Sequence, residues 1–445
     1  MFSKRMSRKT VQLLLLFADT VTSFIAVWLS LLIRNLDVPE FSYYWNHAVS
    51  FIPIFIYAIF AMYLAGLYAV TKPVKNRSIL LEFGLIAIVG WFIGFVFFYF
   101  SLSPQNFPKT ILLLFWIVFC ILALVTRKVL YHVIFIRQQI PVVFLGESKS
   151  YSDLVDDLNG NRMYGYKPVF LYKNISDHPE LRRIVEKGTN VLYIYRYSED
   201  LLREISDELH YLVTNGNQFM EYSEFYEYIE RKIPPEDIGE SWFLSNINLY
   251  RRDFYFFGKR LCDILFSVVG IVLTVCFWPL ICMFIRLESR GDVLFCQERE
   301  GVNGKVFKLY KFRTMTVEQN NGSATAKDDK RITKVGKVLR KSRLDELPQL
   351  INVFLGDMSL IGPRPERPEL AINLEKEVPW YRQRLLVKPG ITGWDQVSGE
   401  YHSPSKEDTY KKLQNDLYYI KNCSISLDIS IAFKTVGTML RREGR

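Results

Sequence analysis

The sequence predicts a membrane protein in three parts: a four-helix transmembrane bundle over residues 1–137, a degenerate Rossmann-like α/β domain over residues 138–250, and an α/β domain with a re-entrant membrane helix over residues 251–445. Three observations predict this class. Apolar residues gather in four long N-terminal stretches, strand and helix patterns alternate in the middle of the chain, and a fifth apolar run carries basic residues at both ends.

The four N-terminal stretches are long enough to cross a bilayer and cover residues 11–32, 48–67, 83–102 and 110–126. Basic residues lie before the first stretch, between the second and third stretches and after the fourth, whereas the other loops are poor in lysine and arginine. The flanking residues are Lys4, Arg5, Arg8, Lys9, Lys72, Lys75, Arg77, Arg127, Lys128 and Arg137. Because basic loops stay in the cytoplasm, both ends of the bundle are predicted to be cytoplasmic.

Asp19 is the intramembrane charge that stands out in this region. A carboxylate is costly in lipid, so Asp19 is expected to face the bundle interior or a polar cavity. A structural role and a role in holding a lipid headgroup are equal alternatives for it.

Composition narrows the classes of function. The formal net charge of +10 suits a protein that lies against anionic phospholipid. The basic residues are dispersed and no nucleic-acid-reading motif accompanies them, so no nucleic acid partner is predicted. The six cysteines lie mostly in or beside apolar segments without metal-ligand spacing, and the five histidines are scattered. Neither a disulfide framework nor a zinc site is therefore expected.

The middle of the chain reads as alternating strands and helices. PVVFLG at 141–146 and NVLYIY at 190–195 are predicted strands, and residues 199–214 have a helical pattern. A dinucleotide fold would carry several glycines after its first strand, but here Gly146 stands alone and Glu147 follows it. The domain is therefore predicted to serve packing, assembly or regulation.

The apolar run at 264–287 is long enough to span a bilayer. Pro279 interrupts it and should break the helix. Basic residues stand before and after the run, and both flanks prefer the cytoplasm. They are Arg251, Arg252, Lys259, Arg260, Arg286, Arg290 and Arg299. A re-entrant helix-break-helix that dips into one leaflet satisfies both ends.

The stretch SRLDELPQLINVFLGDMSLIGPRPE, at 342–366, is the strongest candidate for a site. Leucine, isoleucine and phenylalanine recur at helical spacing from Leu347, Pro348 suits a first turn, and Gly356 stands where the helix should end. Asp345 and Glu346 are then predicted at a helix N-terminus, which favours anions and keeps carboxylates ionised. An ionised carboxylate can attack phosphorus or hold Mg²⁺. On position alone, however, such acids are more often capping residues.

Basic residues surround these acids in the sequence. Arg364 stands between Pro363 and Pro365, a rigid mount for a bidentate phosphate contact. Arg340 and Arg343 end the basic stretch that leads to the acids and could reach a phosphate.

Six blocks in one order carry a family resemblance. They are KRxxD at 259–263, KFRTM at 311–315, LDELPQ at 344–349, GDMSL at 356–360, GPRPE at 362–366 and KPGITGW at 388–394. From residue 259 to residue 394 the chain resembles the polyprenyl-phosphate glycosyl-1-phosphate transferases, also called the bacterial sugar transferase family. The four-helix front end resembles that of the family's long members.

The resemblance implies a reaction. The enzyme would transfer a sugar 1-phosphate from a UDP-sugar to polyprenyl (undecaprenyl) phosphate, releasing UMP, as the first membrane step of surface polysaccharide or glycoconjugate synthesis. Asp345 would be the nucleophile and form an aspartyl-phosphosugar intermediate, and Glu346 would coordinate Mg²⁺. Arg364, mounted between Pro363 and Pro365, would hold the transferred phosphate.

The resemblance implies further site residues. Lys311 and Arg313 would add positive charge around the phosphate. The turn with Gly390, Thr392 and Trp394 would bind the nucleotide. The remaining residues would belong to the re-entrant membrane segment; they are Lys259, Arg260, Asp263 and Pro279.

The predicted location is the bacterial inner (cytoplasmic) membrane, with several spans and a cytoplasmic active site. The predicted partners are the UDP-sugar, the polyprenyl phosphate, the lipid bilayer and further copies of the chain in a homo-oligomer. Two alternatives remain: a membrane-anchored nucleotide-sugar dehydratase and an inactive scaffold for polysaccharide assembly. Tyr228 and Lys232 have the Tyr-x-x-x-Lys spacing of short-chain dehydrogenases, but without a glycine-rich loop we interpret that spacing as coincidence.

Overall fold

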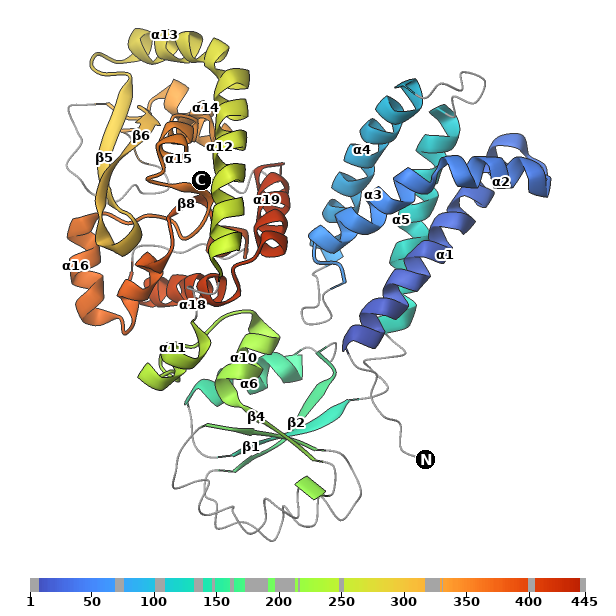
Figure 1. Cartoon of the computed structure of the whole chain (residues 1–445), viewed down its shortest axis with the longest axis horizontal. Coiled ribbons are helices and arrows are strands. Elements are labelled where there is room, and N and C mark those ends of the chain that lie inside the picture. Colours follow the sequence, from blue (N-terminus) through green and yellow to red (C-terminus); the bar gives the residue numbers. More distant parts are fainter. Residues whose placement is uncertain are drawn as a thin grey trace. The chain divides into compact units, whose positions relative to one another are not determined.

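The computed structural model describes residues 8–68, 76–100, 109–131, 139–145, 149–160, 164–172, 191–196, 213–214, 217–247, 252–316, 329, 331–398 and 405–440. Two compact units make up the chain, Met1–Glu230 and Arg231–Arg445 (Figure 1).

The first unit begins with apolar helices. They are α1 (Arg8–Asn35), α2 (Phe41–Ser50), α3 (Ile52–Leu64), α4 (Asn76–Phe100) and α5 (Lys109–Tyr131). Helical segments in α1, α4 and α5 are each long and apolar enough to cross a membrane, and α2 with α3 would add one more span as a pair bent by 52°. The predicted stretch at 48–67 is therefore broken at Phe51. Pro53 lies in the first turn of α3 and has no N–H to continue the preceding helix, which explains the break.

A buried ion pair joins α1 to α5. Asp19 Oδ1 and Oδ2 accept hydrogen bonds from Arg127 Nη1 and Nη2 at 2.7 and 2.8 Å. The guanidinium also lies over the ring of Phe83. The expectation that Asp19 faces the bundle interior is confirmed. The expectation for Arg127 was wrong: it lies within α5 and is buried by Asp19, whereas a flanking residue would be exposed beyond the span.

A parallel four-stranded sheet follows, in the order β2-β1-β3-β4. Its strands are β1 (Ile140–Leu145), β2 (Tyr166–Tyr172), β3 (Leu192–Tyr195) and β4 (Gln218–Glu221). Helices α6 (Lys149–Gly160) and α10 (Tyr222–Glu230) pack on it through a common core that includes Phe144, Tyr151 and Phe225 (Figure 1). The strands predicted at 141–146 and 190–195 are confirmed as β1 and β3. The glycine at 146 and most of the helix predicted at 199–214 lie outside the described residues.

The second unit combines short sheets and helices with a largely exposed apolar helix-break-helix segment. Its elements are α11 (Glu240–Asn246), α12 (Asp253–Thr274), η6 (Val275–Phe277), α13 (Trp278–Glu288), β5 (Leu294–Glu300), β6 (Val306–Phe312), α14 (Lys334–Ser342), η9 (Leu344–Glu346), α15 (Gln349–Leu355), β7 (Ser359–Ile361), α16 (Pro368–Glu377), η10 (Tyr381–Leu386), β8 (Gly390–Thr392), α17 (Trp394–Val397), α18 (Lys406–Asn422) and α19 (Ile425–Leu440). Strands β5 and β6 are antiparallel, and β7 and β8 are parallel.

Helix α13 turns away from α12 after the short segment η6 (Figure 1). Pro279 lies in the first turn of α13, so the helix is interrupted where the proline predicted a break. The segment Asp253–Glu288 is also long and apolar enough to cross a membrane, and only 6% of its most apolar window is buried by protein. An apolar surface of this size would be unfavourable in water, which makes lipid its natural environment.

The two candidate acids lie in a tighter turn than the sequence predicted. Asp345 and Glu346 belong to the 3₁₀ turn η9, which follows Arg343 in a left-handed conformation (φ 57°). Helix α15 begins only at Gln349 and ends at Leu355, and Gly356 caps it with a φ of 96°. The predicted end of the helix is confirmed, but its predicted start was wrong. Pro348 stands at the N-cap position, and the acids precede the helix altogether.

Candidate active site

Three cations from three different elements meet one carboxylate oxygen. Glu346 Oε1 lies 2.8 Å from Arg364 Nη2, 3.2 Å from Lys311 Nζ and 3.7 Å from Arg343 Nη1. Lys311 comes from β6, Arg343 from the end of α14, and Arg364 from the loop after β7. The fold therefore brings together Glu346, Lys311 and Arg364, which the family resemblance had assigned to the site.

The two neighbouring acids have different electrostatic environments. Burial alone would raise the pKa of Glu346, but the charges of Arg364, Lys311 and Arg343 outweigh burial and hold it well below its usual range. Burial and the adjacent charge of Glu346 raise the pKa of Asp345, against the opposing charges of Lys311, Arg340 and Arg343. Glu346 is thus a permanent anion, whereas Asp345 is the acid whose charge is costly.

Two buried polar atoms at the site lack a hydrogen-bond partner among the described residues. They are Asp345 Oδ1 and, one helical turn later, Gln349 Nε2. Buried polar atoms in folded proteins are normally paired, so an unpaired acceptor and an unpaired donor indicate capacity for a ligand. Gln349 belongs to the LDELPQ block, but no role was predicted for it.

Asp345 and Glu346 offer too few ligands for a complete metal site, so they suit a metal ion that takes its other ligands from water and substrate. No group of three or more His, Cys, Asp or Glu side chains that could hold a metal lies within the described residues. Mg²⁺, however, commonly takes one or two carboxylates together with waters and substrate phosphates. Asp345 Oδ1 has no hydrogen-bond partner among the described residues, and the three cations around Glu346 all contact Oε1. Glu346, with Asp345 beside it, fits Mg²⁺ if a pyrophosphate offsets the surrounding positive charge.

Among the described residues, Arg313 forms neither a hydrogen bond nor an ion pair with Asp345 or Glu346. It is buried, and its Nη2 donates to Ser289 O at 2.7 Å and to Ser289 Oγ at 2.9 Å. Arg313 thereby ties the end of β6 to the residue that follows α13. Pro363 and Pro365, in contrast, flank Arg364 and line a small cavity with Glu300, Arg384 and Pro389.

The turn at 389–394 packs against protein rather than against the two acids. An added Cβ on Gly390 would lie 2.1 Å from Gly362 N, so the absence of a side chain is needed for β7 and β8 to approach. Thr392 Oγ1 lies 2.8 Å from Thr435 Oγ1, and Trp394 is buried with its Nε1 donating to Arg231 O. These contacts show how the turn is held in the fold, and its nucleotide-binding role stays a prediction.

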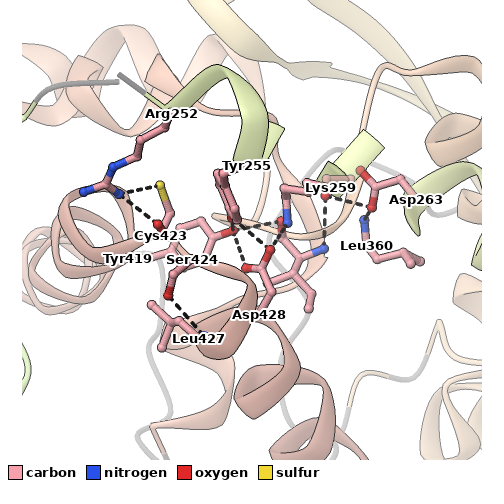
Figure 2. Close-up of polar contacts among 12 residues, drawn as sticks. Arg252, Tyr255, Lys259, Asp263, Leu360, Tyr419, Cys423, Ser424, Leu427 and Asp428 are labelled. Carbon is pink, nitrogen blue, oxygen red and sulfur yellow. Dashed lines mark hydrogen bonds and ion pairs between the residues drawn. The ribbon is translucent and has the colours of Figure 1, made fainter. Parts of the chain in front are cut away.

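Charged residues at the start of α12 fasten that helix to the rest of the unit (Figure 2). Lys259 Nζ lies 2.7 Å from Asp428 Oδ2 on α19. Arg260 donates to the carbonyls of Val353 and Phe354 at the end of α15. Asp263 Oδ1 accepts from Ser359 Oγ and from Leu360 N at 3.0 and 2.9 Å. The KRxxD block thus anchors the apolar helix-break-helix segment to the rest of the unit.

The Tyr228 and Lys232 spacing has no support in the structure. Tyr228 packs on the core of the parallel sheet and stacks on Phe225. Lys232 belongs to the second compact unit, which begins at Arg231.

Comparison with known proteins indicates the same family as the six sequence blocks. A family model described as bacterial sugar transferase matches residues 254–442. The chain is 48% identical over 195 residues to a UDP-N-acetylgalactosamine-undecaprenyl-phosphate N-acetylgalactosaminephosphotransferase of Aeromonas hydrophila, covering 43% of this chain and 45% of that protein. It is 41% identical over 200 residues to a UDP-glucose:undecaprenyl-phosphate glucose-1-phosphate transferase of Xanthomonas campestris pv. campestris, covering 43% of this chain and 41% of that protein.

A shorter relative is matched over most of its length. The sugar transferase EpsL of Bacillus subtilis (strain 168), named as uncharacterized, is 42% identical over 185 residues, which cover 40% of this chain and 88% of that protein. The match to the two longer relatives, in contrast, spans less than half of their length. Lys311, Glu346 and Arg364 all lie within the residues that the family model matches.

Proposed function

The chain belongs to the bacterial sugar transferase family, and on that premise we propose that it transfers a sugar 1-phosphate from a UDP-sugar to undecaprenyl phosphate. The products are an undecaprenyl-diphosphate-linked sugar and UMP. Such a product is the first membrane intermediate of a surface polysaccharide. The observation that carries the proposal is the convergence of Lys311, Arg343 and Arg364 beside two adjacent buried acids.

Asp345 is the proposed nucleophile. Its Oδ1 attacks the phosphorus that bears the sugar, the bond from that phosphorus to the UMP oxygen breaks, and UMP leaves with the bonding electrons. A phosphate oxygen of undecaprenyl phosphate then attacks the aspartyl-phosphosugar, and the carboxylate of Asp345 leaves. The unpaired, buried Oδ1 supports this role because it is free of competing hydrogen bonds among the described residues.

The neighbouring cations stabilise the charge that develops on phosphorus. Arg364 presents a planar guanidinium that suits two phosphate oxygens, and Lys311 presents a point charge. In the absence of substrate both contact Glu346, so an arriving pyrophosphate would compete for the same cations. Preorganised positive charge of this kind is an efficient way to lower a barrier for phosphoryl transfer.

Mg²⁺ is the proposed cofactor, held by Glu346 with Asp345 beside it. When bound, it would neutralise the pyrophosphate and stabilise the departing UMP. The chain's own contribution is to keep Glu346 ionised, which the low pKa of that carboxyl ensures.

We also propose that α12 and α13 form a re-entrant hairpin on the cytoplasmic face of a bacterial inner membrane. Both ends of the hairpin are bonded to the same unit. Lys259 and Asp263 anchor the start of α12, and at the end of α13 the carboxylate of Glu288 accepts from Lys334 N and Val335 N, at 2.5 and 2.7 Å. A straight span would have to pull one of these ends away, and a cytoplasmic site suits a UDP-sugar donor.

The front part of the chain has a proposed role outside the chemistry. The parallel order of the four-stranded sheet supports a Rossmann-like classification. We propose that this domain and the bundle serve assembly of a homo-oligomer, for which the mass of the detergent-solubilised chain is the test.

UMP release tests the reaction. The full chain in nanodiscs would be given a panel of UDP-sugars, with and without undecaprenyl phosphate, and with Mg²⁺ or a chelator. The proposal expects release with one donor that requires both lipid and metal. Release without the lipid, or no release with any donor, would contradict it. A product that stays on the nucleotide, together with bound NAD, would instead support the dehydratase.

A further inference from the structure

The short segment that carries Arg364 is held by its carbonyl groups. Prolines stand on both sides of Arg364 and lack the N–H with which a backbone usually pairs. Four consecutive carbonyls accept hydrogen bonds instead. Pro363 O accepts from Gly390 N at 2.9 Å, Arg364 O from Arg384 Nη2 at 2.8 Å, Pro365 O from Arg299 Nη1 at 3.2 Å, and Glu366 O from Glu300 N at 3.0 Å.

Arg384 is the donor that acts on Arg364 itself, and Arg384 is fixed in turn. Its guanidinium is buried in η10. Nη2 and Nε lie 2.9 and 3.1 Å from Asp416 Oδ2 on α18, and Nη1 donates to Tyr381 Oη at 2.9 Å. All three nitrogen atoms are therefore engaged, and Nη2 divides its donors between Asp416 and the carbonyl of Arg364.

The ion pair contacts the backbone of Arg364, not its side chain. The side chain of Arg364 reaches Glu346 Oε1, whereas its carbonyl reaches Arg384. We infer that the buried Arg384–Asp416 pair is a positioning element that fixes the backbone of Arg364, so that its guanidinium meets the transferred phosphate. This inference rests on the proposed function, because it assumes that Arg364 contacts the substrate.

The charges of Arg384 and Asp416 suit the task of fixing the backbone of Arg364. A hydrogen bond from a charged donor is stronger than one from a neutral donor, and a misplacement of about 1 Å at a site can cost roughly a hundredfold in rate. Burial raises the pKa of Asp416 to about 6, with the charge of Arg384 opposing the shift and that of Asp395 adding to it. Asp416 is therefore ionised at neutral pH and keeps Arg384 paired.

A double-mutant cycle tests whether Arg384 acts through Arg364. Turnover would be measured as UMP release by the full chain in nanodiscs, for Asp416→Asn with native Arg364 and again with Arg364→Lys. We expect a loss of roughly tenfold or more with native Arg364 and at most about a threefold further loss in the Arg364→Lys background. Equal losses in both backgrounds would overturn the inference, because the pair would then act elsewhere. Arg382→Gln is the matched control, since Arg382 is exposed on the same element and pairs with Glu375 at the surface.

Hydrogen–deuterium exchange provides a readout that does not depend on turnover. The peptide with the amides of Gly362, Arg364 and Glu366 should exchange faster in Asp416→Asn than in the unmodified chain or in Arg382→Gln. Unchanged exchange would overturn the inference. An unmodified chain that releases no UMP would overturn the proposed function instead, and the exchange comparison would still decide whether the pair fixes this segment.

A second variant covers the case in which Asp416→Asn loosens the whole unit. Faster exchange throughout Arg231–Arg445 would reveal such general unfolding. Arg384→Lys keeps the charge but cannot serve Asp416 and the Arg364 carbonyl with the same planar fork. For Arg384→Lys we expect the same Arg364-dependent loss of turnover and the same faster exchange of the peptide with Gly362, Arg364 and Glu366. Equal losses of turnover in both Arg364 backgrounds, or unchanged exchange, would overturn the inference.

Discussion

At the scale of single residues, the site depends on how two adjacent acids are made different. Glu346 receives three cations on one oxygen, whereas Asp345 keeps a buried oxygen with no partner among the described residues. Neighbouring carboxyls whose pKa values move in opposite directions commonly divide the roles in a reaction. Here the permanent anion suits the binding of cations, and the acid that is costly to ionise suits nucleophilic attack.

Asp345→Asn should abolish UMP release, because an amide cannot displace UMP from phosphorus. The unmodified enzyme should also lose activity as the pH falls through the pKa of Asp345, which burial and Glu346 raise above the ordinary value of about 3.9. A pH profile of turnover measures both effects. Glu369→Gln, an exposed acid on α16, is the control and should retain turnover. An active Asp345→Asn variant would refute the nucleophile assignment.

Arg364→Lys should lower turnover by roughly tenfold or more, since a lysine keeps the charge but loses the planar fork. The comparison variant is Arg382→Lys, where the same exchange falls on an exposed side chain. Initial rates of UMP release at saturating donor would measure the effect. A nearly silent Arg364→Lys would mean that Arg364 has only a structural role.

At the scale of elements, close backbone packing decides where the site loops lie. Strands β7 and β8 pair in parallel, and Gly362, Gly390 and Gly393 follow or begin them without side chains. An added Cβ on Gly393 would lie 2.4 Å from Gly362 O. The glycines of this turn are thus required by the approach of two strands that set the segment carrying Arg364.

Gly390→Ala should destabilise the second unit by about 1–3 kcal/mol, because the new methyl group overlaps backbone atoms of Gly362. For a unit of this size the melting temperature should fall by about 2–4 °C for each kcal/mol. Gly437→Ala on α19 is the control, since an added Cβ there meets nothing within 4 Å. Equal melting temperatures for the two variants would contradict the packing argument.

A second prediction at this scale concerns the ion pair between Asp19 on α1 and Arg127 on α5. Asp19→Asn leaves the buried charge of Arg127 uncompensated, which costs about 3–5 kcal/mol in buried pairs. The thermal stability of the full chain in detergent should fall accordingly. Adding Arg127→Met removes the orphaned charge and should restore part of the loss. An Asp19→Asn variant as stable as the unmodified chain would show that the pair contributes nothing.

At the scale of the whole molecule, the question is which side of the membrane each segment faces. The apolar hairpin exposes most of its surface, yet both of its ends are bonded to the same folded unit. In the proposed topology lipid surrounds the hairpin, and the chain enters and leaves the membrane on the side where the site lies.

Thiol labelling tests this topology. In a chain without native cysteines, Asp253→Cys and Arg290→Cys mark the two ends of the hairpin, and Asp37→Cys marks a loop predicted on the opposite side. An impermeant reagent should label both hairpin ends in inside-out vesicles only, and Asp37→Cys in intact cells. Labelling of the hairpin ends from opposite sides would establish a full span instead.

Much of this arrangement could be predicted because it depends on local order in the chain. Apolar runs of membrane length, Pro279 within one of them and Gly356 at a helix end are read directly from neighbouring residues, and the structure confirms each feature. The order of six blocks likewise identified the family that the comparisons support. Such features depend on backbone chemistry and on the thickness of a bilayer. They therefore need no partner residue elsewhere in the chain.

Other features were decided only by the tertiary structure, because their partners are distant in sequence. The sequence required that Asp19 be satisfied inside the bundle, but it could not name Arg127, which lies 108 residues away. No local pattern indicated that Gly390 serves a strand contact, that Arg313 bonds Ser289, or that Arg384 and Asp416 hold Arg364. A residue's chemistry determines that it must be paired, whereas the packing of the folded chain determines with which residue.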